Sequence, residues 1–351
     1  MLMKRIVVLD RITKETIRRL EEETGWAVEE RLGVAPEDLP GRVEDADVLI
    51  VRSGTKVTAE VIQAARRLKV IGRAGIGVDN IDMDAASERD IRVVNTPDAT
   101  TVSVAELTLG AVLDLARNIH AADALVRSGE WDRKRFEGME VKGKLIGVIG
   151  FGRIGREVAR MAQAFGMRAV AYDPYLDESH VAGVHLHTLE DVLSRADFVS
   201  LHVPLEDETG SLMGREEMEA MKKGSFLLNF GRGGLVDEVA LADLLESGHL
   251  AGCALDTYAV EPPGETLDRL KAHPRTLLLP HIGSMTREGQ ARVGMELVEG
   301  VGKAVRKIMS AKATALADRR QAAAEAAELA AAEEAAAAAN GPVPPGLPGP
   351  T

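Results

Sequence analysis

The chain has 351 residues, of which 45% are hydrophobic and 28% charged, the balance of an ordinary folded protein. At roughly 100–200 residues per domain, this length predicts about two domains. The net charge of −12 makes the chain a poor match for nucleic acid or an anionic membrane surface. A single cysteine, Cys253, rules out an internal disulfide and a Cys-ligated zinc site; we interpret it as a small buried hydrophobe and expect no metal. Since no apolar stretch approaches ~20 residues, and Asp10 closes the first one, we expect a cytoplasmic protein.

Short runs of Val, Ile and Leu recur along the chain, with helix-period segments between them. Runs without polar alternation are typical of parallel strands covered on both faces, and their alternation with helices predicts parallel α/β sheets. They form two sets, and we therefore expect two Rossmann-like domains. The first set lies at 6–9, 48–51, 70–71 and 93–94, and the second at 145–149, 169–172, 198–203, 226–229, 253–255 and 277–279.

Two long helical patterns are predicted to connect the domains. One covers about 103–127, with Ser103 as N-cap and Glu106 completing a capping box. The other, at 285–309, would return the chain to the first unit. The first domain is then discontinuous, 1–98 plus 284–310, and the second covers 99–283.

The C-terminal segment differs in composition from the rest. Residues 311–339 hold 17 alanines and are expected to be helical, whereas the Pro- and Gly-rich residues 341–351 are expected to be disordered. We interpret 311–351 as a solvated tail, with a partner-binding tail as the alternative.

A glycine-rich loop follows the predicted strand at 145–149. Gly150, Gly152 and Gly155 form G-x-G-x-x-G at the start of a helical pattern, which is typical of a loop that binds a dinucleotide pyrophosphate. Asp173 ends the next strand, 18 residues after Gly155, where a ribose-binding carboxylate is expected. A carboxylate there accepts hydrogen bonds from the ribose hydroxyls and repels a 2′-phosphate, so NAD is favoured over NADP.

Polar residues follow three of the later strands. Arg232, Asp256, Glu261 and His281 all come after apolar runs, and ligands of open α/β sheets lie at the carboxyl ends of strands. An Arg matches a substrate carboxylate, a His moves a proton near neutral pH, and a carboxylate orients that His. Taken singly, each is more often a structural residue; together, behind a nucleotide loop, they point to a dehydrogenase of 2-hydroxy acids.

Eight stretches in this order resemble the D-isomer-specific 2-hydroxyacid dehydrogenases, over about residues 4–308. Within that family the chain is most similar to the branch that oxidises D-3-phosphoglycerate in serine biosynthesis. The stretches are VRSGTKVT, GRAGIGVDNID, VVNTPDATTVSVAELTLG, SGEWDRKRFEG, GFGRIGREVA, NFGRGGLVDE, ALDTYAVEPP and LLPHIGSMT.

The resemblance implies roles for individual residues. The catalytic positions fall on Arg232, Glu261 and His281. The positions that contact NAD fall on Arg153, Ile154, Asp173, Val203, Asp256 and Ser284, beside the three glycines. The substrate positions fall on Arg52, Ser53, Arg73 and Arg133, the last reaching across a dimer.

Partners and alternatives follow from the same resemblance. It implies a homodimer or homotetramer, with the contact made by the helix at 103–127 and the WDRKRF segment. One alternative is a reductase of glyoxylate, hydroxypyruvate or another 2-keto acid. A less favoured one is an NAD-sensing binding protein or corepressor on the same fold.

Overall fold

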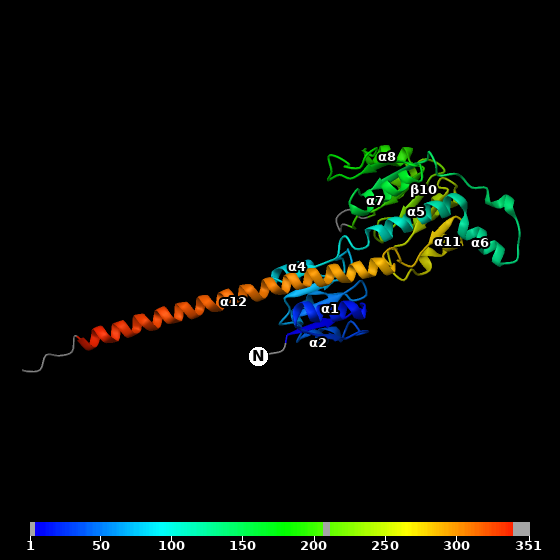
Figure 1. Ribbon diagram of the computed structural model, residues 1–351. Helices are drawn as coiled ribbons and strands as arrows, with labels where there is room; N and C mark the ends of the chain where they lie inside the picture. The colour runs from blue at the N-terminus through cyan, green and yellow to red at the C-terminus, as the bar shows by residue number, and fades with distance from the viewer. Residues whose placement is uncertain (1–3, 206–210, 340–351) are drawn as a thin grey trace, which may run out of the picture.

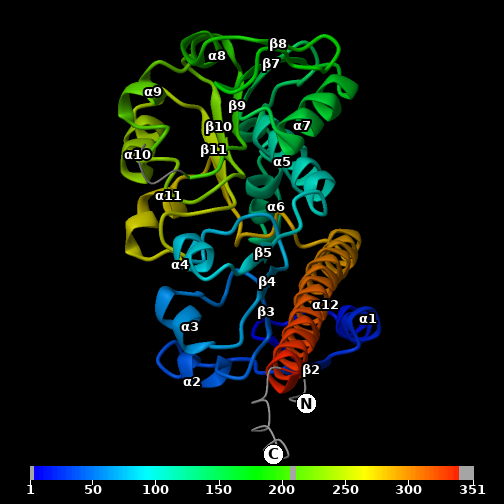
Figure 2. The ribbon, with the colours of Figure 1, turned by 90° about the vertical axis from the view of Figure 1, so that its left-hand side faces the viewer.

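The computed structural model describes residues 4–205 and 211–339 and contains two lobes, each built around a parallel sheet (Figures 1 and 2). The expected disorder of residues 341–351 falls outside the described residues. No helix among the described residues is long and apolar enough to cross a membrane.

The first sheet has the strand order β2-β1-β3-β4-β5. Every neighbouring pair in it is parallel. The order reverses direction between β1 and β3, and at such a switch point the loops after the strands diverge and open a crevice. The strands are β1 (Arg5–Val8), β2 (Ala27–Glu30), β3 (Val48–Val51), β4 (Val70–Arg73) and β5 (Arg92–Val94).

The second sheet has the order β12-β11-β10-β9-β6-β7-β8, again parallel throughout. Its switch point lies between β6 and β9, and the glycine loop follows β6. The strands are β6 (Leu145–Ile149), β7 (Arg168–Tyr172), β8 (His185–Leu186), β9 (Phe198–Leu201), β10 (Phe226–Asn229), β11 (Gly252–Leu255) and β12 (Thr276–Leu278).

Helices cover both faces of each sheet, and several begin at a Thr or Asp whose side chain accepts a backbone N–H of the first turn. The α-helices are α1 (Lys14–Thr24), α2 (Leu39–Val43), α3 (Ala59–Ala64), α4 (Met83–Glu88), α5 (Thr101–Arg117), α6 (Ile119–Arg127), α7 (Arg153–Ala164), α8 (Leu189–Arg195), α9 (Arg215–Glu219), α10 (Glu238–Glu246), α11 (Asp268–Ala272) and α12 (Arg287–Ala339), and the 3-10 helices are η1 (Arg133–Phe136) and η2 (Glu265–Leu267).

Helix α12 returns the chain to the first sheet and then projects from the body (Figure 1). Val293, Leu297 and Val301 are buried against β1, β3 and β4. The approach to β4 is close because Gly72 has no side chain: a Cβ there would lie within 3.0 Å of Leu297 and Val301. The helix runs to Ala339 without a break, so the segment expected at 285–309 and the Ala-rich segment form one helix. The domain limits of 1–98 plus 284–310 and 99–283 remain our proposed division.

The helix predicted at 103–127 was wrong in two respects. Asn118 adopts the left-handed conformation, φ 54°, and separates α5 from α6. Ser103 does not cap the helix: α5 begins two residues earlier, and the Ser103 hydroxyl lies 2.7 Å from that of Thr286 at the start of α12. The predicted capping box with Glu106 is therefore absent, since Ser103 is used to connect α5 to α12.

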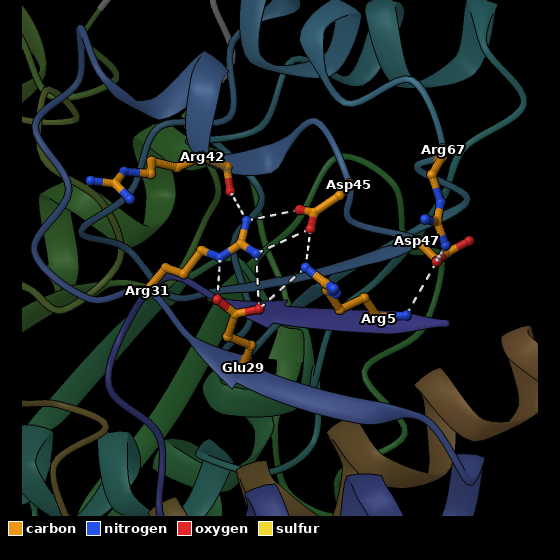
Figure 3. Close-up of polar contacts among 7 residues, drawn as sticks. All are labelled: Arg5, Glu29, Arg31, Arg42, Asp45, Asp47 and Arg67. Carbon is orange, nitrogen blue, oxygen red and sulfur yellow. Dashed lines mark hydrogen bonds and ion pairs between the residues drawn. The ribbon is translucent and has the colours of Figure 1, made fainter. Parts of the chain in front are cut away.

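The predicted fold class of two parallel α/β sheets with a helical C-terminal segment is confirmed. The apolar runs did not reveal β2 and β8. Strand β2 reads Ala-Val-Glu-Glu and lies at the sheet edge, where ion pairs add to its parallel pairing with β1 (Figure 3). Arg31 donates to Glu29 and to Asp45, at 2.9 Å in each case, and these bonds lower the pKa of both carboxyls.

Asp47 forms a second polar cluster beside the first (Figure 3). Its buried carboxylate accepts the Arg5 backbone N–H at 3.1 Å and Lys4 Nζ at 3.0 Å, and it pairs with Arg67. A buried carboxylate needs several donors to offset its lost hydration, so this cluster stabilises the start of β1.

Asp47→Ala should lower the free energy of unfolding by about 2–4 kcal/mol, because it removes a buried acceptor that serves three donors. Urea unfolding followed by circular dichroism measures this. The matched control is Asp38→Ala, an exposed acid without a side-chain capping bond, whose effect should stay within about 0.5 kcal/mol. Equal effects of the two substitutions would contradict the stabilising role of the Asp47 cluster.

Candidate active site

A cleft of about 670 Å³ lies between the two lobes. The first lobe contributes Arg52, which follows β3, and Arg73, the last residue of β4. The second contributes Arg232, Asp256 and His281, which follow β10, β11 and β12. Glu261, in the loop after β11, lines the cleft as well, so the four residues that the sequence predicted to converge do so.

His281 and Glu261 form a hydrogen-bonded pair in this cleft. The His281 Nδ1 atom lies 2.8 Å from Glu261 Oε2, and the other carboxylate oxygen accepts the Tyr258 backbone N–H at 3.2 Å. Because Nδ1 faces the carboxylate, Nε2 is the ring nitrogen available to a substrate hydroxyl. The His281 side chain is 43% exposed, so a small molecule in the cleft can reach it.

The backbone around His281 is held in an unusual conformation. Its φ is 54°, in the left-handed region that few non-glycine residues adopt. Asp256 holds the following turn by accepting the N–H groups of Ile282 at 2.8 Å and Gly283 at 2.7 Å. Burial raises the pKa of Asp256, and these two bonds act in the opposite direction.

Tyr258 connects β11 and β12, the strands that precede Glu261 and His281. Its hydroxyl donates to the carbonyls of Leu255, at the end of β11, and Leu279, just past β12, at 3.1 and 2.8 Å. Burial raises the Tyr258 pKa to about 12, so the hydroxyl stays protonated as a donor. Tyr258 thereby positions the backbone that leads to His281.

Arg232 lies in a tight glycine turn after β10. Asn229 supports the turn: its Nδ2 donates to the Arg232 carbonyl at 2.8 Å and its Oδ1 accepts the Gly231 N–H at 3.1 Å. Gly233 allows close contact with the next loop, since a Cβ there would lie 1.7 Å from the Tyr258 carbonyl oxygen. The guanidinium Nε donates to Asp79 of the first lobe at 3.1 Å.

Cationic side chains of the first lobe line the cleft opposite His281. They are Arg52, Lys56 and Arg73, with Ser53 beside them. Burial and the neighbouring Arg232 charge lower the Arg73 pKa to about 10. The Arg73 Nε atom is buried and has no hydrogen-bond partner within the described part of the chain.

The three glycines of the loop after β6 have different surroundings. Gly150 has φ 88°, and a Cβ there would lie 2.6 Å from Val203 Cγ1. A Cβ at Gly155 would lie 2.2 Å from the Gly150 carbonyl oxygen, whereas one at Gly152 would have no neighbour within 4 Å among the described residues. Gly152 therefore leaves the backbone at the N-terminus of α7 open to a ligand, and a dinucleotide pyrophosphate fits this loop.

The other predicted cofactor positions surround this loop or line the cleft. Asp173, at the end of β7, accepts the Phe151 N–H at 2.9 Å. Arg153 pairs with Asp98, in the segment that crosses from the first lobe into α5. Ile154 and Ser284 line the cleft itself.

Not every predicted residue reaches the cleft. Arg133 is exposed on η1 and is not among the residues that line it. Cys253 is fully buried, and burial raises the pKa of its thiol to about 12, as expected of a small hydrophobe rather than a nucleophile. Among the described residues, no three His, Cys, Asp or Glu side chains group as metal ligands would.

Sequence reasoning missed Lys56, Asp79 and Tyr258. Lys56 and Asp79 lie in the quoted motifs VRSGTKVT and GRAGIGVDNID, but neither directly follows a predicted strand, which was the criterion used to find site residues. Tyr258 follows Asp256 by two residues and acts through a hydroxyl contact with another strand, which local sequence does not reveal.

Comparisons with known proteins show which family the chain resembles. Residues 109–283 match the model of the D-isomer specific 2-hydroxyacid dehydrogenase, NAD binding domain. A hydroxypyruvate reductase of Thermotoga maritima is 46% identical over 74% of this chain and 85% of its own length. The chain belongs to the D-isomer-specific 2-hydroxyacid dehydrogenase family. The matched domain is an NAD-binding one, and we assign NAD as its cofactor.

Two further family members bear on the substrate. A D-3-phosphoglycerate dehydrogenase of Methanocaldococcus jannaschii is 46% identical over 87% of this chain and 58% of its own length. The solved structure of a glyoxylate reductase from Paecilomyes thermophila has a TM-score of 0.79 and 30% identity, covering 88% of this chain and 97% of that one. The chain spans between half and three fifths of the length of three curated phosphoglycerate dehydrogenases that it matches.

Gly152→Ala and Gly155→Ala should separate cofactor binding from folding. The Gly155 substitution places a methyl group against the Gly150 carbonyl and should cost about 1–3 kcal/mol of stability. The Gly152 substitution meets no protein atom, so stability should change by less than about 0.5 kcal/mol. Because its methyl group projects where the loop faces the cofactor, NAD affinity should fall roughly tenfold or more.

Chemical unfolding and calorimetric titration with NAD measure the two effects. Unchanged NAD binding by the Gly152 variant would contradict the assignment of this loop to the pyrophosphate.

Proposed function

We propose that the protein oxidises D-3-phosphoglycerate to 3-phosphohydroxypyruvate with NAD. The observation that carries this proposal is the group of Arg52, Lys56 and Arg73 opposite His281 in one cleft, with the Arg73 Nε unpartnered. An unphosphorylated 2-hydroxy acid has one carboxylate, which Arg232 alone can match. A phosphate adds close to two negative charges and several acceptor oxygens, which suit the remaining cations. The names of the phosphoglycerate dehydrogenase relatives support the same choice.

In this proposal the chain holds the substrate at both ends. Arg232 binds the carboxylate and polarises the oxygen of the forming carbonyl. Arg52, Arg73, Lys56 and Ser53 hold the phosphate. The carbon between these groups, which carries the hydroxyl, then lies on the side of the cleft where His281 Nε2 is available.

His281 takes the hydroxyl proton at Nε2 during oxidation. Glu261, bonded to Nδ1, keeps the ring in this orientation and stabilises the imidazolium that forms. In the reverse direction His281 returns the proton to the carbonyl oxygen. NAD, when bound, supplies the hydride acceptor.

The residues proposed to hold NAD are the glycine loop, Arg153 and Asp173. Gly152 and the α7 N-terminus face the pyrophosphate, Gly150 and Gly155 allow the turn that presents them, and Arg153 adds a cation there. Asp173 disfavours a 2′-phosphate and selects NAD over NADP. Asp256, Ile154 and Ser284 border the nicotinamide side of the site, and Val203 lies beside Gly150 of the glycine loop.

The second candidate is the reduction of hydroxypyruvate, glyoxylate or another 2-keto acid. The same Arg232, Glu261 and His281 perform it in reverse. The names of the Thermotoga and Paecilomyes relatives favour it.

We further propose a homodimer formed through α6 and η1. This arm exposes apolar side chains, including Trp131 at 78%, Val126 at 54% and Ile119 at 53%. In contrast, Leu109, Val112 and Leu115 of α5 pack inside the second lobe. Arg133 on the arm would then reach the cleft of the partner subunit.

His281→Gln should lower kcat by about 10²–10⁴-fold, because the hydroxyl proton loses its acceptor. The NAD dissociation constant should change only a few-fold, since the glycine loop is untouched. Steady-state kinetics and calorimetry measure both. His185→Gln, an exposed histidine on β8, is the matched control and should leave kcat unchanged. A His281 variant with near-normal kcat would show that another group moves the proton.

The substrate is tested by comparing D-3-phosphoglycerate with D-glycerate, each with NAD and NADP, in the wild type and in Arg73→Ala. The wild type should use the phosphorylated substrate with NAD most efficiently. Arg73→Ala should raise KM for D-3-phosphoglycerate roughly 10–100-fold and leave that for D-glycerate much less affected, since a lost bond to a charged group costs about 1.5–3 kcal/mol. Equal losses for both substrates would favour the keto-acid reductase instead.

A further inference from the structure

Arg232 and Asp79 make a contact that crosses the cleft. Arg232 follows β10 of the second lobe, and Asp79 lies in the loop after β4 of the first. The Arg232 Nε donates to Asp79 Oδ2 at 3.1 Å. Both side chains border the volume in which the substrate is proposed to bind, so their contact bears on how that volume is shaped.

The Arg232 guanidinium is held at two points. Nε donates to Asp79 and Nη1 donates to the Gly231 carbonyl at 2.9 Å, and Nη2 lies close to Gly77. A Cβ at Gly77 would lie 1.9 Å from Arg232 Nη2 and 2.5 Å from Asp79 Oδ2, so the glycine makes room for the ion pair. Of these contacts, Asp79 alone adds an opposite charge and fixes the rotation of the guanidinium from the other lobe.

The loop that carries Asp79 is itself well supported. The neighbouring Asn80 donates from Nδ2 to the carbonyls of Arg52 and Thr55, at 2.7 and 2.6 Å. Its own carbonyl accepts the Val57 N–H at 2.8 Å, and Val57 forms a bridge with Ile81. Asp79 is therefore presented by a backbone that the loop bearing Arg52 holds in place.

We propose that Asp79 is a positioning residue for Arg232. It holds Nε of the guanidinium, so that the terminal nitrogens are oriented to bind the substrate carboxylate. Since the two residues belong to different lobes, the carboxylate site is complete only when the lobes face each other as they do here. This role rests on the proposed function, in which Arg232 binds that carboxylate.

Asp79 could instead act only as a countercharge, because it is close enough to Arg73 to act on its charge as well. The two roles predict different effects on two anions. Loss of a countercharge strengthens the binding of any anion in the cleft. Loss of a positioning residue weakens the binding of a carboxylate, whereas a phosphate binds as before or more tightly.

The experiment compares Asp79→Ala and Asp79→Asn with Asp84→Asn, an exposed acid four residues past Asn80 on α4, as the control. The affinity of oxamate for the NADH complex measures carboxylate binding at Arg232. Competition by inorganic phosphate measures anion binding at Arg52, Lys56 and Arg73. In Asp79→Ala, oxamate should bind about tenfold or more weakly, phosphate should bind no more weakly, and kcat should fall roughly 10–100-fold. Asp79→Asn keeps an acceptor oxygen and should show a smaller loss, and Asp84→Asn should match the wild type.

A double-variant test makes the role of Arg232 explicit. In an Arg232→Lys background, which lacks Nε, Asp79→Ala should change oxamate binding by less than about twofold. Wild-type oxamate affinity in Asp79→Ala, or equal weakening of oxamate and phosphate, would overturn the positioning role. A wild-type chain that neither binds oxamate nor turns over a 2-hydroxy acid would instead contradict the proposed function, and the role of Asp79 with it.

Discussion

The site depends on the way in which the two lobes are joined. The chain passes from the first lobe to the second just before α5 and returns just before α12, and these crossings are bonded to each other. The Ser103 and Thr286 hydroxyls lie 2.7 Å apart, and Arg292 Nε donates to the Ala99 carbonyl at 2.8 Å. Because the two connecting segments lie next to each other, the carboxyl ends of both parallel sheets face the same cleft.

This arrangement divides the chemistry between the lobes. The first lobe supplies cations, of which Arg73 is partly desolvated and lacks one hydrogen-bond partner. The second supplies the hydrogen-bonded His281 and Glu261 pair and the glycine loop. A ligand with two anionic ends suits such a cleft, because it offsets charges that neither lobe can neutralise alone. A rigid framework such as the Asp256 and Tyr258 contacts keeps His281 in place while the cleft is filled.

The sequence allowed prediction of those features that depend on local pattern. The continuous apolar runs located most strands of both sheets, and the G-x-G-x-x-G pattern located the turn between β6 and α7. Strand β2 was missed because it lies at the sheet edge and ends in two Glu residues, so its sequence contains no continuous apolar run. The break at Asn118 escaped because the helical pattern continues on both sides of one left-handed residue. Asp79 and Tyr258 make their contacts with segments that are distant in the sequence. These contacts exist only in the tertiary fold, so local sequence patterns do not reveal them.

Helix α12 has a consequence for the hydrodynamics of the molecule. Past Ile308 it no longer packs on the first lobe, and the remaining turns to Ala339 extend for about 45 Å at 1.5 Å per residue (Figure 1). A rod of this length adds little mass but much friction, so the chain diffuses and tumbles more slowly than a sphere of equal mass. Elution volume in gel filtration will therefore overstate the size of each species, and counting subunits requires a mass measurement that is independent of shape.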